Sequence, residues 1–283
     1  MDGSQMLEIA RSSTLEVLRA APMGLILGDD EDEVLLPTRY VPAATEPGER
    51  LDVFVYMDSE DRPIATTDRP LAEADEFACL RVVSVNKIGA FLDWGLPKDL
   101  LLPFRSQLSR VRPGQSVVVR VLCDRASGRP VATAKVENFL ERPPARLRAG
   151  QEVQLLVCEE TELGCKAIVD ASFGGLIHCG PGMARPDVGS TQKGFISSIR
   201  SDGKVDLSLG PVGRVAADEA RDTLLSALQQ AGGRLDLCDA SDPEDIRRGV
   251  GLSKKAFKRA VGALYRERLI TLGDARIDLV GEK

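Results

Sequence analysis

One pattern of turns and short apolar strands occurs three times along the chain, at intervals of about 70 residues. In each unit a tight turn precedes an apolar strand; the turns are Pro47-Gly48, Pro113-Gly114 and Val188-Gly189, and the strands are residues 51–57, 117–123 and 194–199. Each unit then closes with a polar turn and another short strand, at residues 58–66, 124–133 and 200–208. The repeat predicts an array of small, similar units rather than one large core.

Each unit contains signals for five short strands. The others are expected near residues 14–19, 24–27 and 34–37 in the first unit, 77–85, 89–92 and 100–103 in the second, and 153–159, 164–167 and 175–178 in the third. Many short strands with turns at regular spacing favour small closed barrels. A longer crossing between the third and fourth strands is typical of the OB fold. We therefore expect barrels at residues 1–70, 71–143 and 144–212.

After Gly213 the apolar period changes from that of strands to that of helices. Apolar residues recur at helical spacing over 217–231, and a short strand is expected at 235–237. A second helix starts near Pro243, and Ser253 is a good N-cap for a third over 254–268. Residues 270–279 have the pattern of a hairpin. Residues 213–283 are thus predicted to form an α+β module, a winged helix-turn-helix, behind a mainly β region.

Three groups of residues carry a resemblance to a known family. Residues 85–92 (Val-Asn-Lys-Ile-Gly-Ala-Phe-Leu) resemble a turn of the S1 variant of the OB fold, with Ile88 where S1 domains carry an aromatic residue and Pro103 where they carry histidine. The three groups that resemble the bacterial conserved virulence factor B family are residues 96–104, 199–209 and 252–258. The resemblance implies tandem S1-like barrels with a winged helix, RNA binding, a role in post-transcriptional regulation, and no enzyme activity.

Composition limits the function in several ways. The net charge of −6 runs against a simple nucleic-acid-binding domain, so any positive surface must be local. The acidic run at residues 29–33 would repel phosphate, which argues against the first barrel as the main contact. The six cysteines are scattered and the single histidine is His178, so we expect neither a metal site nor a cofactor. Without a signal peptide or an apolar run of about 20 residues, a cytoplasmic protein without a membrane partner is expected.

Single-strand binding needs aromatic platforms for bases and cations for phosphates. Phe91 and Trp94 are the aromatic candidates, although residues three apart on a strand need not share a face, and Lys87 and Arg129 lie on the adjoining turns. Phe54 and Tyr56 do share a face, and we favour a core or an inter-repeat contact for them. His178 has no neighbour at ligand spacing, so a structural role is favoured and RNA contact is a minor alternative.

The strongest basic feature is the third helix of the C-terminal module. Lys254, Lys255, Lys258 and Arg259 lie on neighbouring turns, opposite the apolar stripe of Phe257, Val261 and Leu264. Such a face can neutralise phosphates, although solvated helix faces are also common. The leading hypothesis is a non-catalytic RNA-binding regulator whose partner is single-stranded RNA. A DNA-binding transcription regulator and a protein scaffold with weak nucleic-acid affinity remain alternatives.

Overall fold

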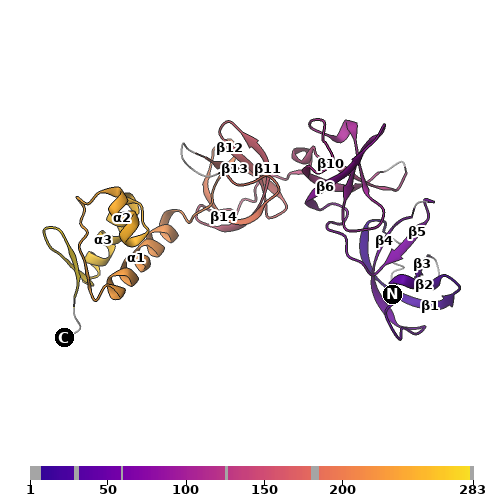
Figure 1. The fold of residues 1–283 in the computed structure, drawn as a ribbon, viewed down its shortest axis with the longest axis horizontal. Coiled ribbons are helices and arrows are strands. Elements are labelled where there is room, and N and C mark those ends of the chain that lie inside the picture. Colours follow the sequence, from indigo (N-terminus) through magenta and orange to yellow (C-terminus); the bar gives the residue numbers. More distant parts are fainter. Residues whose placement is uncertain (1–7, 29–31, 59, 125–126, 180–184, 281–283) are drawn as a thin grey trace. The chain divides into compact units, whose positions relative to one another are not determined.

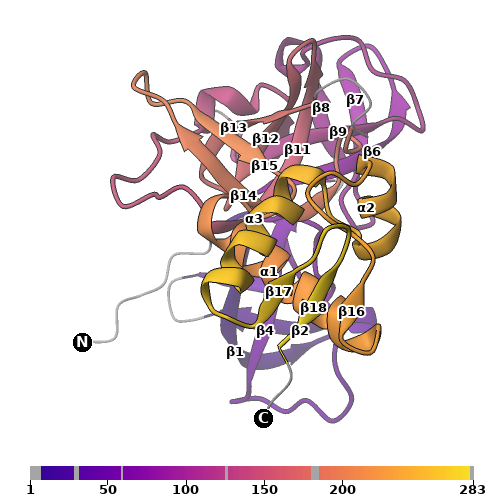
Figure 2. The ribbon, with the colours of Figure 1, turned by 90° about the vertical axis from the view of Figure 1, so that its left-hand side faces the viewer.

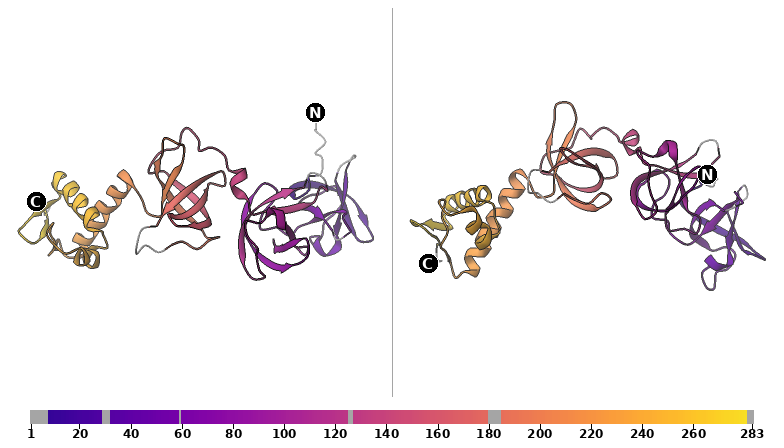
Figure 3. Two further views of the ribbon diagram at one scale, coloured as in Figure 1. Left: turned by 90° about the horizontal axis from the view of Figure 1, so that it is seen from above. Right: turned by 45° about the horizontal axis from the view of Figure 1, so that its top comes forward.

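Most of the described strands close into three small barrels. The structure is a computed structural model that describes residues 8–28, 32–58, 60–124, 127–179 and 185–280. The first barrel contains β1 (Arg11–Ala21), β2 (Gly24–Gly28), β3 (Glu33–Pro37), β4 (Arg50–Met57) and β5 (Pro63–Thr66). The second contains β6 (Phe77–Val85), β7 (Gly89–Asp93), β8 (Leu100–Pro103), β9 (Ser116–Cys123) and β10 (Pro130–Thr133). The third contains β11 (Glu152–Thr161), β12 (Gly164–Val169), β13 (Phe173–His178), β14 (Thr191–Ile199) and β15 (Val205–Ser208). Figure 1 labels most of these strands, and the closed form of the barrels is visible in Figure 3.

The three barrels share one strand order, in which the last strand pairs in parallel with the third. The order is β1-β2-β3-β5-β4 in the first barrel and is repeated as β11-β12-β13-β15-β14 in the third. The parallel pairs place Leu35 beside Ile64, Leu101 beside Val131, and Leu176 beside Asp206. Short 3-10 turns, Thr38–Tyr40 and Phe104–Ser106, follow the third strand in the first two barrels. These features confirm the predicted S1- and OB-like architecture.

Strand β4 is buried on both of its faces, because alternate residues of a strand point to opposite sides. Val53 and Val55 lie in the core of the first barrel. Phe54 and Tyr56 point the other way and join the apolar cluster of the second barrel, where they are 0% and 3% exposed. The expected core or inter-repeat role of this pair is confirmed.

Contacts divide the chain into two compact units. The first comprises residues 1–141, 155–174 and 179–191, and the second comprises residues 142–154, 175–178 and 192–283. The domain limits expected at residues 70, 143 and 212 stay a prediction; the five strands of each barrel fall between them. Of the acidic run, residues 29–31 lie outside the described residues, while Glu33 forms an ion pair with Arg19.

The C-terminal module has three helices and a small sheet, which Figure 2 shows side by side. The helices are α1 (Gly213–Gln230), α2 (Pro243–Val250) and α3 (Lys254–Arg266), and the sheet is β16 (Arg234–Leu235), β18 (Ile277–Leu279) and β17 (Ile270–Leu272). The Ser253 hydroxyl accepts a bond from the backbone N–H of Ala256 (3.3 Å), so the predicted N-cap is confirmed. Helix α3 ends two residues before the expected position, where Arg268 takes a positive φ of 60°.

Candidate nucleic-acid interface

The outer face of the second barrel contains a cavity of about 290 Å³. Phe91, half-buried on β7, lines it together with Ile88, Leu101 and Val131. Lys98, Arg105 and Arg129 also line it, together with the carboxylates of Asp99 and Asp124. An aromatic ring with nearby cations can bind a base by stacking and its phosphates by charge.

Trp94 does not serve this face as a platform. Its side chain is 2% exposed and meets the Phe54 ring edge-on, with 5.7 Å between the ring centroids. Its indole N–H donates to the backbone oxygen of Lys98 (2.7 Å), which satisfies its polar atom inside the core. Because neither face of the ring is free for a base, the expectation of a surface role for Trp94 was wrong.

The two cations expected in the second barrel have different surroundings. The exposed guanidinium of Arg129 pairs with Asp61, a residue of the first barrel, and Lys98 lies 3.7 Å from the same carboxylate. Lys87 is exposed on the turn between β6 and β7 and has no ion pair among the described residues. Arg105, which sequence reasoning missed, is likewise exposed and lacks a carboxylate partner in the described part of the chain. Lys87 and Arg105 are therefore the cations here with charge available for phosphate.

In the third barrel a polar cluster occupies the end of β13 and the neighbouring strand β15. His178 Nε2 lies 2.8 Å from Asp206 Oδ1, and the Arg200 guanidinium donates to both oxygens of this carboxylate. The Ser198 hydroxyl also donates to Asp206 (2.7 Å). These bonds, that of Arg200 foremost, hold the pKa of Asp206 far below its ordinary value. The His178 side chain is 47% exposed, so the cluster can present hydrogen-bonding groups to a ligand.

Sequence spacing did not reveal Asp206 as the partner of His178, because the two residues lie 28 positions apart. The repeat contained a usable signal: Asp206 stands where the first two units have Ile64 and Val131. A charged residue at a position that is apolar in the other repeats indicates that the outer surface of this barrel has a different role.

Helix α3 presents a basic stripe to solvent. Lys255, Lys258, Arg259 and Arg266 follow helical spacing and are exposed. At Gly262, between them, an added Cβ would meet no atom within 4 Å, so the middle of the stripe is open. Lys254 is half-buried beside the stripe, and Lys258 lies 3.6 Å from Asp239. Lys255 and Arg259 have no ion pair within the described residues.

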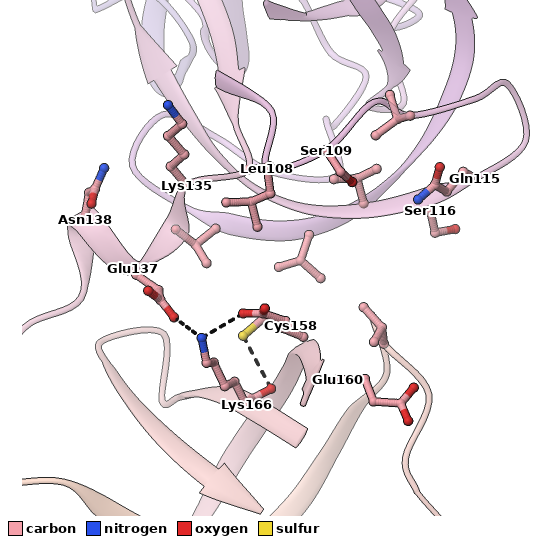
Figure 4. Close-up of a pocket in the computed structure, with 17 residues that line it drawn as sticks. Leu108, Ser109, Gln115, Ser116, Lys135, Glu137, Asn138, Cys158, Glu160 and Lys166 are labelled. Carbon is pink, nitrogen blue, oxygen red and sulfur yellow. Dashed lines mark hydrogen bonds and ion pairs between the residues drawn. The ribbon is translucent and has the colours of Figure 1, made fainter. Parts of the chain in front are cut away.

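A separate cavity of about 730 Å³ does not suit nucleic acid. The ammonium of Lys166 forms ion pairs with Glu137 (2.6 Å; Figure 4) and Glu159 (2.8 Å), and these two carboxylates raise the pKa of Lys166. Burial raises the pKa of the Cys158 thiol in this cavity to about 12. The lining contains no aromatic ring, so the cavity provides no stacking platform, and Lys135 is its one lysine without an ion pair among the described residues.

Two family models match this chain. A model described as a CvfB-like winged helix domain matches residues 222–279, and an S1 domain model matches residues 11–68. The uncharacterized protein YitL of Bacillus subtilis is 29% identical over 262 residues, covering 89% of this chain and 87% of that protein. Conserved virulence factor B of Staphylococcus aureus N315 is 25% identical over 242 residues, covering 83% and 80%. The resemblance to the conserved virulence factor B family is confirmed.

The S1 match falls on the first barrel, whereas the sequence motifs pointed to the second. Both models describe non-enzymatic folds, and S1 and winged-helix domains together suggest nucleic-acid binding. Among solved structures, a Streptococcus pneumoniae multidomain protein with nucleic acid binding domains aligns over 96% of this chain and 99% of its own, at 22% identity and a TM-score of 0.44. The CSD456 segment of Drosophila Unr aligns over 72% and 98%, at 13% identity and a TM-score of 0.19. Among the described residues, no helix is long and apolar enough to cross a membrane.

Proposed function

We propose that this chain is a non-catalytic, regulatory RNA-binding protein of the cytoplasm that uses α3 and the outer faces of the second and third barrels. The observation that carries the proposal is the α3 stripe. In a chain of net charge −6, Lys255 and Arg259 stand exposed on one helix face without a carboxylate partner in the described part. Such cations release counterions when they meet phosphate, which is the main source of affinity for nucleic acids.

The barrels support single-stranded RNA as the ligand. Phe91 offers a partly exposed ring on the second barrel, and stacking of one base is worth about 1–3 kcal/mol. On the third barrel, His178 and Arg200 border a carboxylate that is already neutralised, so they can hydrogen-bond a ligand without strong repulsion. Small barrels with a stacking residue and scattered cations suit unpaired bases better than a closed duplex.

The test compares the affinity for a labelled single-stranded RNA with that for a duplex DNA of equal length, at one stated salt concentration. The proposal expects tighter binding of the RNA. Preference for the duplex would favour the winged-helix transcription regulator, for which the open stripe of α3 is the supporting feature. Binding of neither ligand would favour the protein scaffold, and metal-dependent RNA cleavage abolished by one acidic substitution would contradict a non-catalytic role.

The structure selects the variant for this test. Lys255 and Arg259 are changed together to alanine, because Lys254 is half-buried and Lys258 is near Asp239. If both contact phosphate, the slope of log affinity against log salt for a single strand should flatten by about 1.4, or ~0.7 per contact. Arg234→Ala is the matched control in the same module, because Arg234 is already paired with Asp236 (2.9 Å). An unchanged slope in the double variant would remove α3 from the interface.

A further inference from the structure

A short arginine-rich segment joins the second barrel to the third. Residues 142–148, here called the junction segment, contain Arg142, Arg146 and Arg148 and no acidic residue. The three side chains are exposed, and none has an ion pair within the described residues. This is a dense local positive charge in a chain whose acidic residues outnumber its basic ones, 43 to 37.

The carboxylates that flank the junction segment are engaged elsewhere. Glu141 accepts a hydrogen bond from the Ser172 hydroxyl (3.1 Å). Glu152 pairs with Lys193 (2.8 Å). Neither carboxylate forms an ion pair with the three arginines among the described residues.

The junction segment is also held in place. Leu147 is 7% exposed, and its backbone N–H donates to the oxygen of Pro144 (2.9 Å), which closes a turn. Just after it, Gly150 donates to the oxygen of Ile196 on β14 (2.8 Å), and Ile196 donates back to Gln151 (2.9 Å). Pro143 and Pro144 restrict the backbone further. Arg146 and Arg148 therefore project from an ordered turn, on either side of a buried leucine.

We infer that the junction segment is a phosphate-binding site for the backbone of single-stranded nucleic acid, an inference that rests on the proposed function. All three cations are arginine, whose planar guanidinium binds phosphate oxygens in a bidentate manner. Arg146 and Arg148, two residues apart, lie within about 7 Å along the chain and can meet neighbouring phosphates. The segment has no aromatic residue, so it contributes affinity without preference for a base sequence.

The experiment measures the affinity of the full chain for a fluorescein-labelled 20-nucleotide oligouridine by anisotropy, between 50 and 200 mM KCl. The test variant replaces Arg142, Arg146 and Arg148 with alanine. Loss of three single-strand phosphate contacts should flatten the salt slope by about 2. Over this range the wild type should then lose about twentyfold more affinity than the variant. The thermal melt should not change, because the side chains are exposed.

A charge-matched control replaces Arg19, Arg62 and Arg234, which are already paired with Glu33, Asp58 and Asp236. It removes the same net charge and should keep the wild-type slope, as should a variant with lysine at all three junction positions. The inference is overturned if the alanine variant keeps the wild-type slope, or if the control flattens it equally.

Other outcomes separate this inference from the proposed function. If the wild type binds no oligonucleotide even at 50 mM salt, the proposed function fails, and the phosphate site fails with it. If oligouridine binding is unchanged in the alanine variant but binding of poly-glutamate is lost, the junction segment serves an acidic protein partner instead.

Discussion

Strands β4 and β14 occupy the same place in the first and third barrels, but their outward residues have different surroundings. In the first barrel Phe54 lies opposite Thr66 and Tyr56 opposite Ile64. At the same register in the third barrel, Phe195 lies opposite Ser208 and Ser198 opposite Asp206. The first set is covered by the second barrel, whereas Phe195 is half-buried and the Asp206 cluster borders solvent.

The difference shows how one barrel fold can serve two purposes. A closed barrel needs only its inward residues for its core, so the outward residues are free to vary. In the first barrel they stabilise contact with a neighbouring barrel. In the third they form hydrogen bonds and remain accessible to a ligand.

The largest expected effect tests whether the outward residues of the first barrel stabilise the fold. Phe54→Ala should lower the free energy of unfolding by about 3–5 kcal/mol, because it empties a fully buried aromatic site between two barrels. Phe195→Ala, at the matching register, should cost clearly less because that ring is partly exposed. Urea unfolding of both variants measures the difference. Equal losses in the free energy of unfolding would show that the two outward faces are equally buried in solution, which would contradict the proposed difference between the first and third barrels.

Much of this architecture could be predicted from sequence. The repeat indicated five-stranded barrels, the strand expected at residues 77–85 is β6, and the Ser253 cap is present. These features are local, because turn residues and apolar periodicity act within a few residues of one another.

The sites were harder to predict because they depend on what packs outside each barrel. The alternation of side chains along a strand indicates which residues point away from the barrel core. It does not indicate whether those side chains contact solvent or a neighbouring barrel. It therefore could not show that Trp94 is covered by Phe54, or that Asp61 of the first barrel neutralises Arg129. It also could not show that Asp206 lies beside His178, because that contact depends on strand pairing between distant segments.

A smaller effect tests the third barrel as a ligand-binding surface. His178→Ala should weaken single-stranded RNA binding by about 0.5–1.5 kcal/mol, the worth of one hydrogen bond. The matched variant is Pro37→Ala, because Pro37 also lies two residues beyond the parallel pair of its barrel. It should leave affinity unchanged. Equal effects at the two positions, measured by anisotropy at one salt concentration, would argue that the barrels do not differ in their use.

The smallest expected effect is the contribution of the Asp206 cluster to the pH dependence of the free energy of unfolding. The pKa of Asp206 is lowered in the folded protein, chiefly by its hydrogen bonds to Arg200. A carboxylate with a depressed folded-state pKa stabilises the fold at pH values above its unfolded pKa, about 3.9. That contribution is lost as the pH falls below this value toward the folded-state pKa. The stability difference between wild type and Asp206→Asn should therefore shrink as the pH falls below about 4.

Urea midpoints measured at each pH give this difference directly. Glu162→Gln is the control, since Glu162 is exposed on the same barrel and has no ion pair among the described residues. Its midpoint should follow the wild type at every pH. If the difference in urea midpoint between the wild type and the Asp206→Asn variant stays unchanged down to pH 2, the substitution alters packing rather than charge. Then the cluster would not be the electrostatic feature that distinguishes the third barrel from the first, where Ile64 occupies the same position.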